Sequence, residues 1–175
     1  MGLEAARRSP GYATSVRRHL DGFADLLRID LVRIWEGERD PAVLSVTTHA
    51  QPLLFSVELA CAQSLMELGV RPAAVLGHSV GEVVAATVAG VFAVEDAIRF
   101  VAERARLMNE APAGVMLAVA ASAADVRRAL VDGVWISAVN GPAQTVVGGA
   151  AESIAAFRPV LDDCRMTYRE LSTSH

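Results

Sequence analysis

The sequence predicts an α/β protein built from two parts, and three observations carry this prediction. A short apolar run follows a proline over residues 71–79, as in a buried strand of a parallel sheet. Segments with helical periodicity flank this run on both sides. From residue 114 onward the segments follow the order β-α-β-β-α-β, which is the ferredoxin-like order. We therefore expect one part over residues 1–113 and a ferredoxin-like part over residues 114–175.

The elements of the first part follow from apolar spacing and from their end signals. Residues 11–31 carry apolar side chains every three or four positions, which predicts a helix. A largely buried helix is expected over 48–69, where it ends at Gly69. After the strand, a helix rich in small residues is closed by Gly90, and another covers 94–110 with acids in its first turn.

The elements of the second part are shorter and alternate more regularly. Strands are expected over 114–121, 133–141, 143–150 and 167–174, with helices over 122–132 and 151–164. The stretch "NGPAQ" between the two middle strands is typical of a hairpin turn. This order of elements is complete in itself, so we expect a separate small unit.

Composition excludes several classes of protein. The 175 residues are 53% hydrophobic and carry a formal net charge of −4, which disfavours disorder and offers no reason to expect nucleic acid or membrane partners. The basic residues are all arginines and form no patch. No stretch is long enough to span a membrane, and Cys61 and Cys164 lack metal-ligand spacing. We expect a cytoplasmic protein with reduced thiols.

A serine stands between two glycines in Gly77-His78-Ser79-Val80-Gly81. It follows the expected strand and precedes a helix, which is the setting of a nucleophile elbow. Glycines suit such a sharp turn because side chains two residues either way would meet neighbouring backbone. The Val80 N–H at the helix start would then stabilise an oxyanion. The alternative is a structural serine that caps the helix.

The proton acceptor for such a serine is harder to find. His78 adjoins Ser79, but neighbouring side chains point apart in an elbow. His19 lies among arginines, where we expect a solvated helix face, and His49 also precedes the serine by many residues. His175 is the last residue, with no element behind it. The residues alone therefore indicate a nucleophile without a partner.

Arg104 falls in an apolar sector of the helix over 94–110, opposite a face that gathers Arg99, Glu103, Arg106 and Glu110. A guanidinium there needs an anionic partner, because an unpaired buried charge is strongly unfavourable. One interpretation is a structural ion pair with Glu82. The other is a ligand carboxylate, which arginine binds with two parallel hydrogen bonds. With Ser79, the second interpretation indicates acyl chemistry on a dicarboxylic thioester or ester.

Five stretches together resemble the acyltransferase domains of modular polyketide synthases, relatives of the malonyl-CoA:acyl-carrier-protein transacylases. These are "AQPLLFSVELA", "GVRPAAVLGHSVGEVVAATVAGVFAVEDAIRFVAERARLM", "GVMLAVAAS", "ISAVNGPAQTVVGG" and "LSTSH". They cover nearly the whole chain in the family's order. The resemblance implies a partial α/β-hydrolase-like large subdomain with a ferredoxin-like small subdomain.

The resemblance also implies roles for individual residues. Ser79 would attack the thioester of an acyl-CoA, most often malonyl-CoA, and pass the acyl group to the phosphopantetheine thiol of an acyl carrier protein. The Val80 N–H would be one oxyanion donor, and Arg104 would bind the malonyl carboxylate. No resident cofactor or metal is implied, and neighbouring ketosynthase and other synthase domains would be further partners.

Other matched positions have two interpretations. Gln51 and Asn140 match residues that often line the pocket, but they also suit a helix-end amide and a turn asparagine. His78 and Glu82 complete the motif, and a structural role is the more natural one for both.

Two departures from the family's pattern bear on activity. The family begins with a strand carrying GQGxQ, which supplies the second oxyanion donor, whereas this chain begins "MGLEAARRSP". The family's catalytic histidine closes a block that His175 would open, so that histidine would fall three residues beyond it. We therefore expect a fragment with little turnover. The GHSVG motif with a histidine opening the later block resembles malonyl-selective domains.

Three hypotheses for function remain open on the sequence. The first is acyl transfer from malonyl-CoA to a carrier protein, as the activity of the parent domain. The second is a serine hydrolase of the esterase type, which has no need of Arg104. The third is a non-catalytic fragment that docks a carrier protein and has no need of Ser79.

Overall fold

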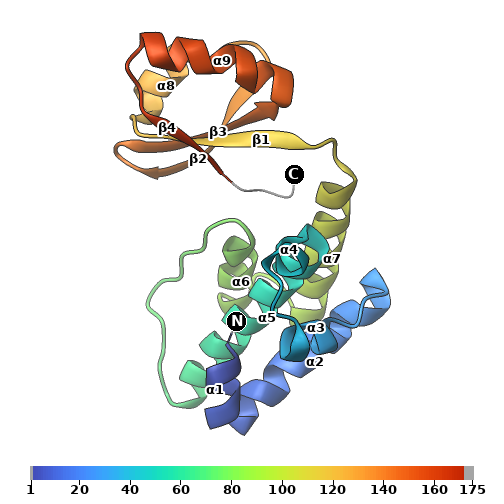
Figure 1. The fold of residues 1–175 in the computed structure, drawn as a ribbon. Helices are drawn as coiled ribbons and strands as arrows, with labels where there is room; N and C mark the ends of the chain where they lie inside the picture. Colours follow the sequence, from blue (N-terminus) through green and yellow to red (C-terminus); the bar gives the residue numbers. More distant parts are fainter. Residues whose placement is uncertain (1, 172–175) are drawn as a thin grey trace. The chain divides into compact units, whose positions relative to one another are not determined.

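The computed structural model describes residues 2–171, which divide into two compact units between Glu110 and Ala111. This division lies three residues before the expected boundary. Figure 1 shows helices throughout the first unit and, in the second, two helices on one face of a sheet. Each unit has its own hydrophobic core, so each is described by itself.

The described residues of the first unit form helices joined by irregular segments. The helices are α1 (Leu3–Arg8), α2 (Pro10–Leu27), α3 (Leu31–Gly37), α4 (Pro41–Ser45), α5 (Thr47–Glu67), α6 (Val80–Val88) and α7 (Val94–Glu110). Helix α2 begins where the Ser9 hydroxyl accepts a hydrogen bond from the Tyr12 N–H, with Pro10 in the first turn. Gly69 and Gly90 both have positive φ, as expected of residues that follow a helix end. The expected helices are confirmed.

The core of the first unit forms where α2, α5 and α7 pack together. The rings of Phe23 and Phe55 meet edge to face with 5.8 Å between their centroids, and Val101 of α7 is fully buried beside them. Burying one such side chain contributes about 1.5–3 kcal/mol. This core holds α5 against α6 and α7, the three helices that carry the candidate site residues of this unit.

The expectation that His19 lies on a solvated face is wrong. His19 is only 3% exposed, and its ring packs edge to face against Phe55. The physical reason is its position three residues after Val16 and four before Phe23, which places it on the buried stripe of α2. Burial has the largest effect and lowers the pKa of His19. The contact with the Ser56 carbonyl partly opposes this effect, and the charge of Arg18 lowers the pKa by a smaller amount.

The expected strand over residues 71–79 is also absent. These residues form an irregular segment between α5 and α6 in which Val75 is 40% exposed and Leu76 is 98% exposed. A strand needs neighbouring strands to satisfy its backbone N–H and C=O groups. The first unit provides none among residues 2–110, so an apolar run of strand character stays unpaired.

The second unit has the predicted order of elements. It contains β1 (Gly114–Val119), α8 (Ala123–Ala129), β2 (Val134–Gly141), β3 (Gln144–Ala150), α9 (Ala151–Asp163) and β4 (Tyr168–Leu171). The sheet order is β2-β3-β1-β4 with every pair antiparallel, which is the ferredoxin-like arrangement. The prediction for this unit is confirmed over the described residues.

The middle strands meet in the expected hairpin. Gly141 pairs with Gln144 across a turn of two residues, and the register shifts at two places along β2. Along the same strand Val134 is buried whereas Trp135 is 65% exposed, as the alternation of a half-buried strand requires. Leu117, Val147 and Phe157 are fully buried between the sheet and the two helices.

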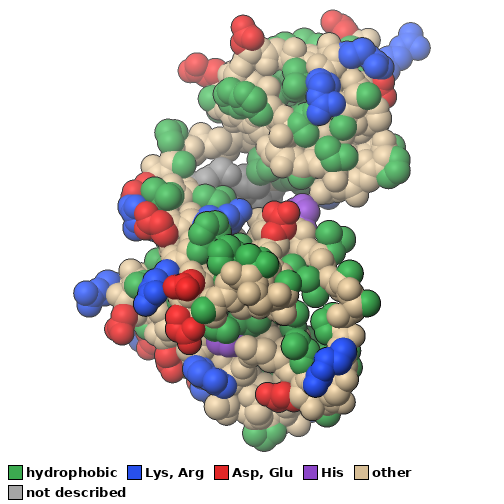
Figure 2. All heavy atoms as spheres, turned by 180° about the vertical axis from the view of Figure 1, so that it is seen from behind, with side chains coloured by type: hydrophobic (Ala, Val, Ile, Leu, Met, Phe, Trp, Pro, Cys, Tyr) green, Lys and Arg blue, Asp and Glu red, His purple; other side chains and the backbone are tan. Residues whose placement is uncertain are grey.

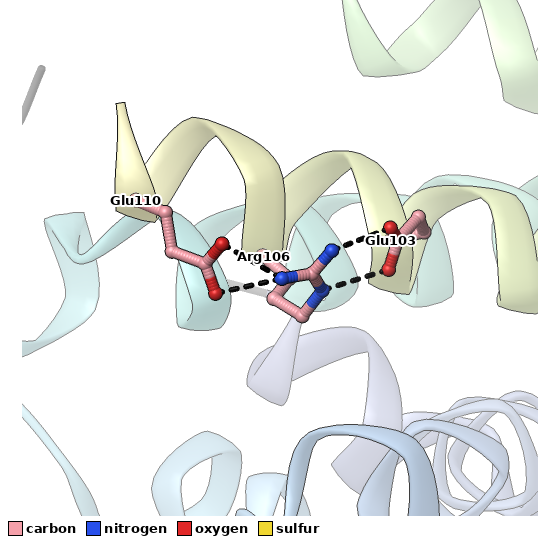
Figure 3. A network of polar contacts seen from close by, with 3 residues as sticks. All are labelled: Glu103, Arg106 and Glu110. Atoms are coloured by element: carbon pink, nitrogen blue, oxygen red, sulfur yellow. Dashed lines mark hydrogen bonds and ion pairs between the residues drawn. The ribbon is translucent and has the colours of Figure 1, made fainter. Parts of the chain in front are cut away.

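The outer face of α7 is charged and solvated, as predicted. Arg106 pairs with Glu103 at 2.6 Å and with Glu110 at 2.7 Å, and all three side chains are substantially exposed (Figure 3). Hydrogen bonds from Arg106 lower the pKa of Glu103. On the face drawn in Figure 2, arginine and acidic side chains are interspersed rather than gathered by sign.

Two further expectations concern the surface and the surroundings of the protein. Both cysteines, Cys61 and Cys164, are free and exposed. No helix within residues 2–171 is both long and apolar enough to cross a bilayer.

Candidate acyl-transfer site

Ser79 has the backbone conformation that a nucleophile elbow requires. Its φ is 54° and its ψ is −120°, a region that residues other than glycine rarely occupy. Helix α6 begins directly after it, and the Gly81 N–H donates to the His78 carbonyl at 2.9 Å across the turn. The Ser79 side chain does not cap the helix, so the alternative of a capping serine is not what the structure contains.

Gly77 is required by crowding inside this turn. A Cβ added at Gly77 would lie 2.0 Å from the backbone C and O atoms of Gly81. A Cβ at Gly81 would meet only the end of the Glu58 side chain, at 3.3 Å. The expected crowding therefore excludes a side chain at Gly77, whereas at Gly81 a side chain would need only a small shift of Glu58.

Val80 is the first residue of α6, and its side chain is 5% exposed. The N–H groups of a helix's first turn have no acceptor within the helix, and the helix dipole adds positive potential there. The Val80 N–H is thus available beside Ser79, in the position of the predicted oxyanion donor.

Arg104 lies next to Ser79. Its Nη2 donates to the Ser79 Oγ at 3.2 Å, although the two residues are 25 positions apart in the chain. The sector around Arg104 is less buried than expected, because Phe100 and Leu107 are 50% and 53% exposed and only the side facing Val101 and Ala105 is covered. Helix α7 packs through Val101 and Ala105, and the larger side chains of Phe100 and Leu107 remain partly exposed to solvent.

Arg104 has no carboxylate partner among the residues that the structure describes. Its Nη1 donates instead to the Oε1 of Gln51 in α5. The alternative of a structural ion pair with Glu82 is not formed between these residues, and Glu82 is exposed in the first turn of α6. The two groups that hold this half-buried guanidinium are neutral, so they offer no counter-charge and the guanidinium can still pair with an anion.

Gln51 connects Arg104 to two residues that the sequence did not single out. Its Nε2 lies 3.2 Å from the Thr47 Oγ1 and 3.3 Å from the Met108 Sδ. Thr47 and Gln51 are only 7% and 6% exposed. The signal for both residues was present in the sequence, because each lies four positions from a predicted site residue on the same helix.

Two further predicted residues, His78 and Asn140, have exposed side chains. His78 forms no side-chain hydrogen bond with Ser79 within residues 2–171, as expected from its place in the elbow. Asn140 is exposed on β2, in the second unit. His175 and the block that it would open lie outside the described residues, as does the catalytic histidine expected after it.

An apolar cleft of about 480 Å³ opens between α5, α6 and the segment before Ser79. Its lining includes Glu58 and His78 but neither Ser79 nor Arg104, so it is not the place where the proposed chemistry occurs. Partial burial raises the pKa of Glu58 there, although much of its side chain remains exposed. The cleft is mainly the apolar surface that borders the unpaired segment over residues 71–79.

Neither a metal centre nor a protein base is assembled at Ser79 by the described residues. No group of three or more histidines, cysteines and acids within residues 2–171 could hold a metal ion. His19 contacts the Ser56 carbonyl, and His49 contacts the Val43 carbonyl at 2.8 Å. The part of the site that the structure describes is therefore a serine in a sharp strained turn, a backbone N–H at a helix start, and a guanidinium without an acidic partner.

Comparisons with known proteins show the family to which the chain belongs. The model of the acyl transferase domain family matches residues 1–166. The phenolphthiocerol synthesis polyketide synthase type I Pks15/1 of Mycobacterium marinum is 39% identical over 176 residues, covering 100% of this chain and 8% of its own length. This chain is thus a small part of the length of that relative.

Solved structures match at the level of the fold. The acyltransferase domain from the second module of the salinomycin polyketide synthase superposes with a TM-score of 0.89 at 36% identity, over 100% of this chain and 41% of that one. The SpnD acyl transferase domain, solved in complex with 2-(pent-4-yn-1-yl)malonyl, has a TM-score of 0.89 at 34% identity. The match covers 99% of this chain and 41% of that one.

A malonyl-transacylase in complex with its type II polyketide synthase acyl-carrier protein has a TM-score of 0.85 at 26% identity. The match covers 99% of this chain and 58% of that one. The α/β fold class is confirmed by these matches. The family match over residues 1–166 and the matches to solved acyltransferases lead to one conclusion. This chain belongs to the acyl transferase domain family and is similar to the acyltransferase domains of polyketide synthases.

Proposed function

We propose that the site transfers a malonyl group from CoA, through an ester on Ser79, to the phosphopantetheine thiol of an acyl carrier protein. The observation that carries this proposal is the contact of Arg104 with Ser79 at 3.2 Å, in the absence of an acidic partner for Arg104 among the described residues. A nucleophile beside a free guanidinium suits an acyl group that ends in a carboxylate.

The first half of the reaction forms the acyl-enzyme. The Ser79 Oγ attacks the thioester carbonyl, and the carbonyl oxygen becomes an oxyanion beside the Val80 N–H. The C–S bond then breaks, CoA leaves as a thiolate, and the hydroxyl proton passes through a base to that thiolate. In the second half the carrier thiol attacks the ester carbonyl, and Ser79 regains its proton.

Arg104 selects the acyl group in this scheme. In malonate one methylene separates the acyl carbon from the free carboxylate, so a guanidinium in contact with the nucleophile is within reach of that carboxylate. An acetyl group offers no such anion. Charge-assisted hydrogen bonds of this kind contribute about 1.5–3 kcal/mol, which is roughly tenfold to a hundredfold in binding.

The relatives support the same assignment of substrate and partner. One matched acyltransferase domain was solved with a substituted malonyl group, and one matched malonyl-transacylase was solved with its acyl-carrier protein. We propose the corresponding substrate, malonyl-CoA, and the corresponding partner, an acyl carrier protein, for this chain, with neighbouring ketosynthase and other synthase domains in the parent protein. No resident cofactor takes part in the scheme.

We also propose that this chain turns over slowly. The test is therefore a single-turnover acylation followed by mass spectrometry of the intact protein, which detects one acyl group per chain without repeated turnover. We expect malonyl-CoA to label Ser79, and Ser79→Ala to remove the label. Arg104→Ala is expected to slow labelling by malonyl-CoA about tenfold to a hundredfold while leaving labelling by acetyl-CoA nearly unchanged. The labelled protein should then transfer its acyl group to a holo carrier protein and not to the apo form.

Two outcomes would contradict the proposal. If Arg104→Ala affects malonyl-CoA and a neutral ester equally, the site is that of a general serine hydrolase. If Ser79→Ala leaves labelling and carrier-protein binding unchanged, the chain is a docking fragment instead.

A further inference from the structure

We propose that Thr47 and Met108 are positioning residues, which hold the Arg104 guanidinium against Ser79 by orienting the Gln51 amide between them. The inference rests on the proposed function, because it concerns how Arg104 is kept ready for a substrate carboxylate. Neither residue touches Ser79 in the contacts that the structure describes.

The four side chains form one unit across the contact between α5 and α7. Thr47 and Gln51 are four residues apart on α5, and Arg104 and Met108 are four residues apart on α7. Residues with this spacing lie one above the other on a helix face. Each helix therefore presents one pair, and Gln51 contacts every other member.

The orientation of the Gln51 amide follows from the chemistry of its neighbours. A guanidinium can only donate hydrogen bonds, so the Oε1 of Gln51 must face Arg104. A thioether can only accept, so the Nε2 must face Met108, at 3.3 Å. Thr47 accepts a second bond from the same Nε2 at 3.2 Å. Reversing the amide would place N–H groups against the guanidinium.

Burial makes this orientation matter. Thr47 and Gln51 are almost inaccessible, so water does not readily replace a lost partner there. If Thr47 is removed as an acceptor, one N–H of a buried amide loses its bond, and the amide gains rotational freedom. The guanidinium then loses a fixed acceptor on the side away from Ser79.

The absence of charge on Gln51 also matters for the positioning of Arg104. A carboxylate at this position would form an ion pair with Arg104 and compete with the substrate carboxylate for its charge. An amide oxygen holds the guanidinium in place and leaves that charge uncompensated. The geometry therefore serves selection of anionic acyl groups rather than general stability of the fold.

The experiment compares binding of malonyl-CoA and acetyl-CoA to the 175-residue chain by titration calorimetry. We expect Thr47→Val to weaken malonyl-CoA binding by about threefold to tenfold, the value of one hydrogen bond, with acetyl-CoA binding unchanged. Thr47→Ser retains the hydroxyl and should restore the wild-type ratio. Met108→Leu, which keeps volume but removes the acceptor, should change the ratio in the same direction.

Thr87→Val is the matched control, because it also removes a buried threonine hydroxyl, one that donates to the Val83 carbonyl at 2.7 Å in α6. We expect it to leave the ratio of the two dissociation constants unchanged. If Thr47→Val weakens both ligands equally, or Thr47→Ser fails to restore the ratio, the positioning role is overturned.

Arg104→Ala separates this inference from the proposed function. If Arg104→Ala loses selectivity for malonyl-CoA while Thr47→Val does not, the positioning role alone is overturned. If wild type binds malonyl-CoA no more tightly than Arg104→Ala does, the carboxylate-binding role is wrong, and the positioning role is overturned with it.

Discussion

Ser79 stands in a rarely occupied backbone conformation, and the residue that permits it is Gly77. The added Cβ of Gly77→Ala would lie 2.0 Å from the Gly81 backbone, which cannot move without displacing the start of α6. We predict that Gly77→Ala lowers the melting temperature and abolishes acylation of Ser79. Intact mass spectrometry after incubation with malonyl-CoA, together with thermal unfolding, checks both effects.

Gly81→Ala is the control for this prediction, since it changes the other glycine of the same motif. Its Cβ would meet only the flexible end of Glu58, and alanine favours helix over glycine by about 0.5–1 kcal/mol. We therefore expect Gly81→Ala to keep the wild-type melting temperature within a few degrees. Equal damage from both substitutions would show that the turn is not limited by crowding at Gly77.

His19 makes stability depend on pH. Its folded-state pKa is lowered from the ordinary value of 6.5, first by burial and then by Arg18, so the unfolded chain takes up a proton more readily. The stabilising contribution of the neutral ring is complete above pH 6.5 and is lost as the pH falls toward the folded-state pKa. We predict that the free energy of unfolding decreases over that interval.

Urea unfolding of wild type and His19→Gln between roughly pH 7.5 and 5 measures this effect. Glutamine cannot titrate, so the variant should show a weaker pH dependence than wild type, whatever its overall stability. His49→Gln, at a position outside the core cluster of the first unit, is the matched substitution with which the effect of His19→Gln is compared. An unchanged slope in His19→Gln would mean that other groups cause the loss.

At the scale of elements, the apolar run before Ser79 remains unpaired. Leu76 is 98% exposed, and the cleft beside it has mainly apolar walls. We predict that Leu76→Lys lowers binding of a hydrophobic dye and slows aggregation, with a change in unfolding free energy within about 0.5 kcal/mol. Leu59→Lys, at a position only 2% exposed, should by contrast unfold the first unit.

A loss of stability in Leu76→Lys similar to that in Leu59→Lys would show that residue 76 is covered in solution. Dye fluorescence, light scattering and thermal unfolding of the two variants distinguish these cases.

The same element shows what local sequence can and cannot predict. Periodicity correctly predicted α2, α5 and α7 and the whole β-α-β-β-α-β order, because those elements satisfy their backbone within themselves or with strands of the same unit. The run over 71–79 has strand composition, but strand formation depends on partners that composition does not reveal. The strand predicted over 71–79 is therefore absent because it has no partner strand, although its residues favour the extended conformation.

The candidate site also combines features that the local sequence predicts with features that depend on tertiary packing. The motif predicted the elbow at Ser79, and the helical projection pointed to Arg104 as an arginine in need of a partner. The identity of that partner was beyond the sequence, because Gln51 lies 53 positions away and reaches Arg104 only through packing of α5 on α7. The wrong prediction for His19 could have been avoided from the sequence. It was based on the neighbouring arginines, whereas the helical spacing of His19 already placed it on the buried face.

At the scale of the molecule, the described residues form two separate cores. Phe23 belongs to the core of the first unit and Phe157 to that of the second, and both are fully buried. Truncating such a residue to alanine typically costs about 3–5 kcal/mol. Because the two core clusters share no residue, we expect each substitution to act mainly within its own unit.

Hydrogen exchange followed by mass spectrometry checks this expectation. Phe157→Ala should accelerate exchange in β1, β3 and α9 far more than in α2 and α5, and Phe23→Ala should do the reverse. The double variant should show the sum of the two patterns, as for independent sites. Acceleration of α2 and α5 by Phe157→Ala, to the degree caused by Phe23→Ala, would instead mean that the units unfold as one cooperative body.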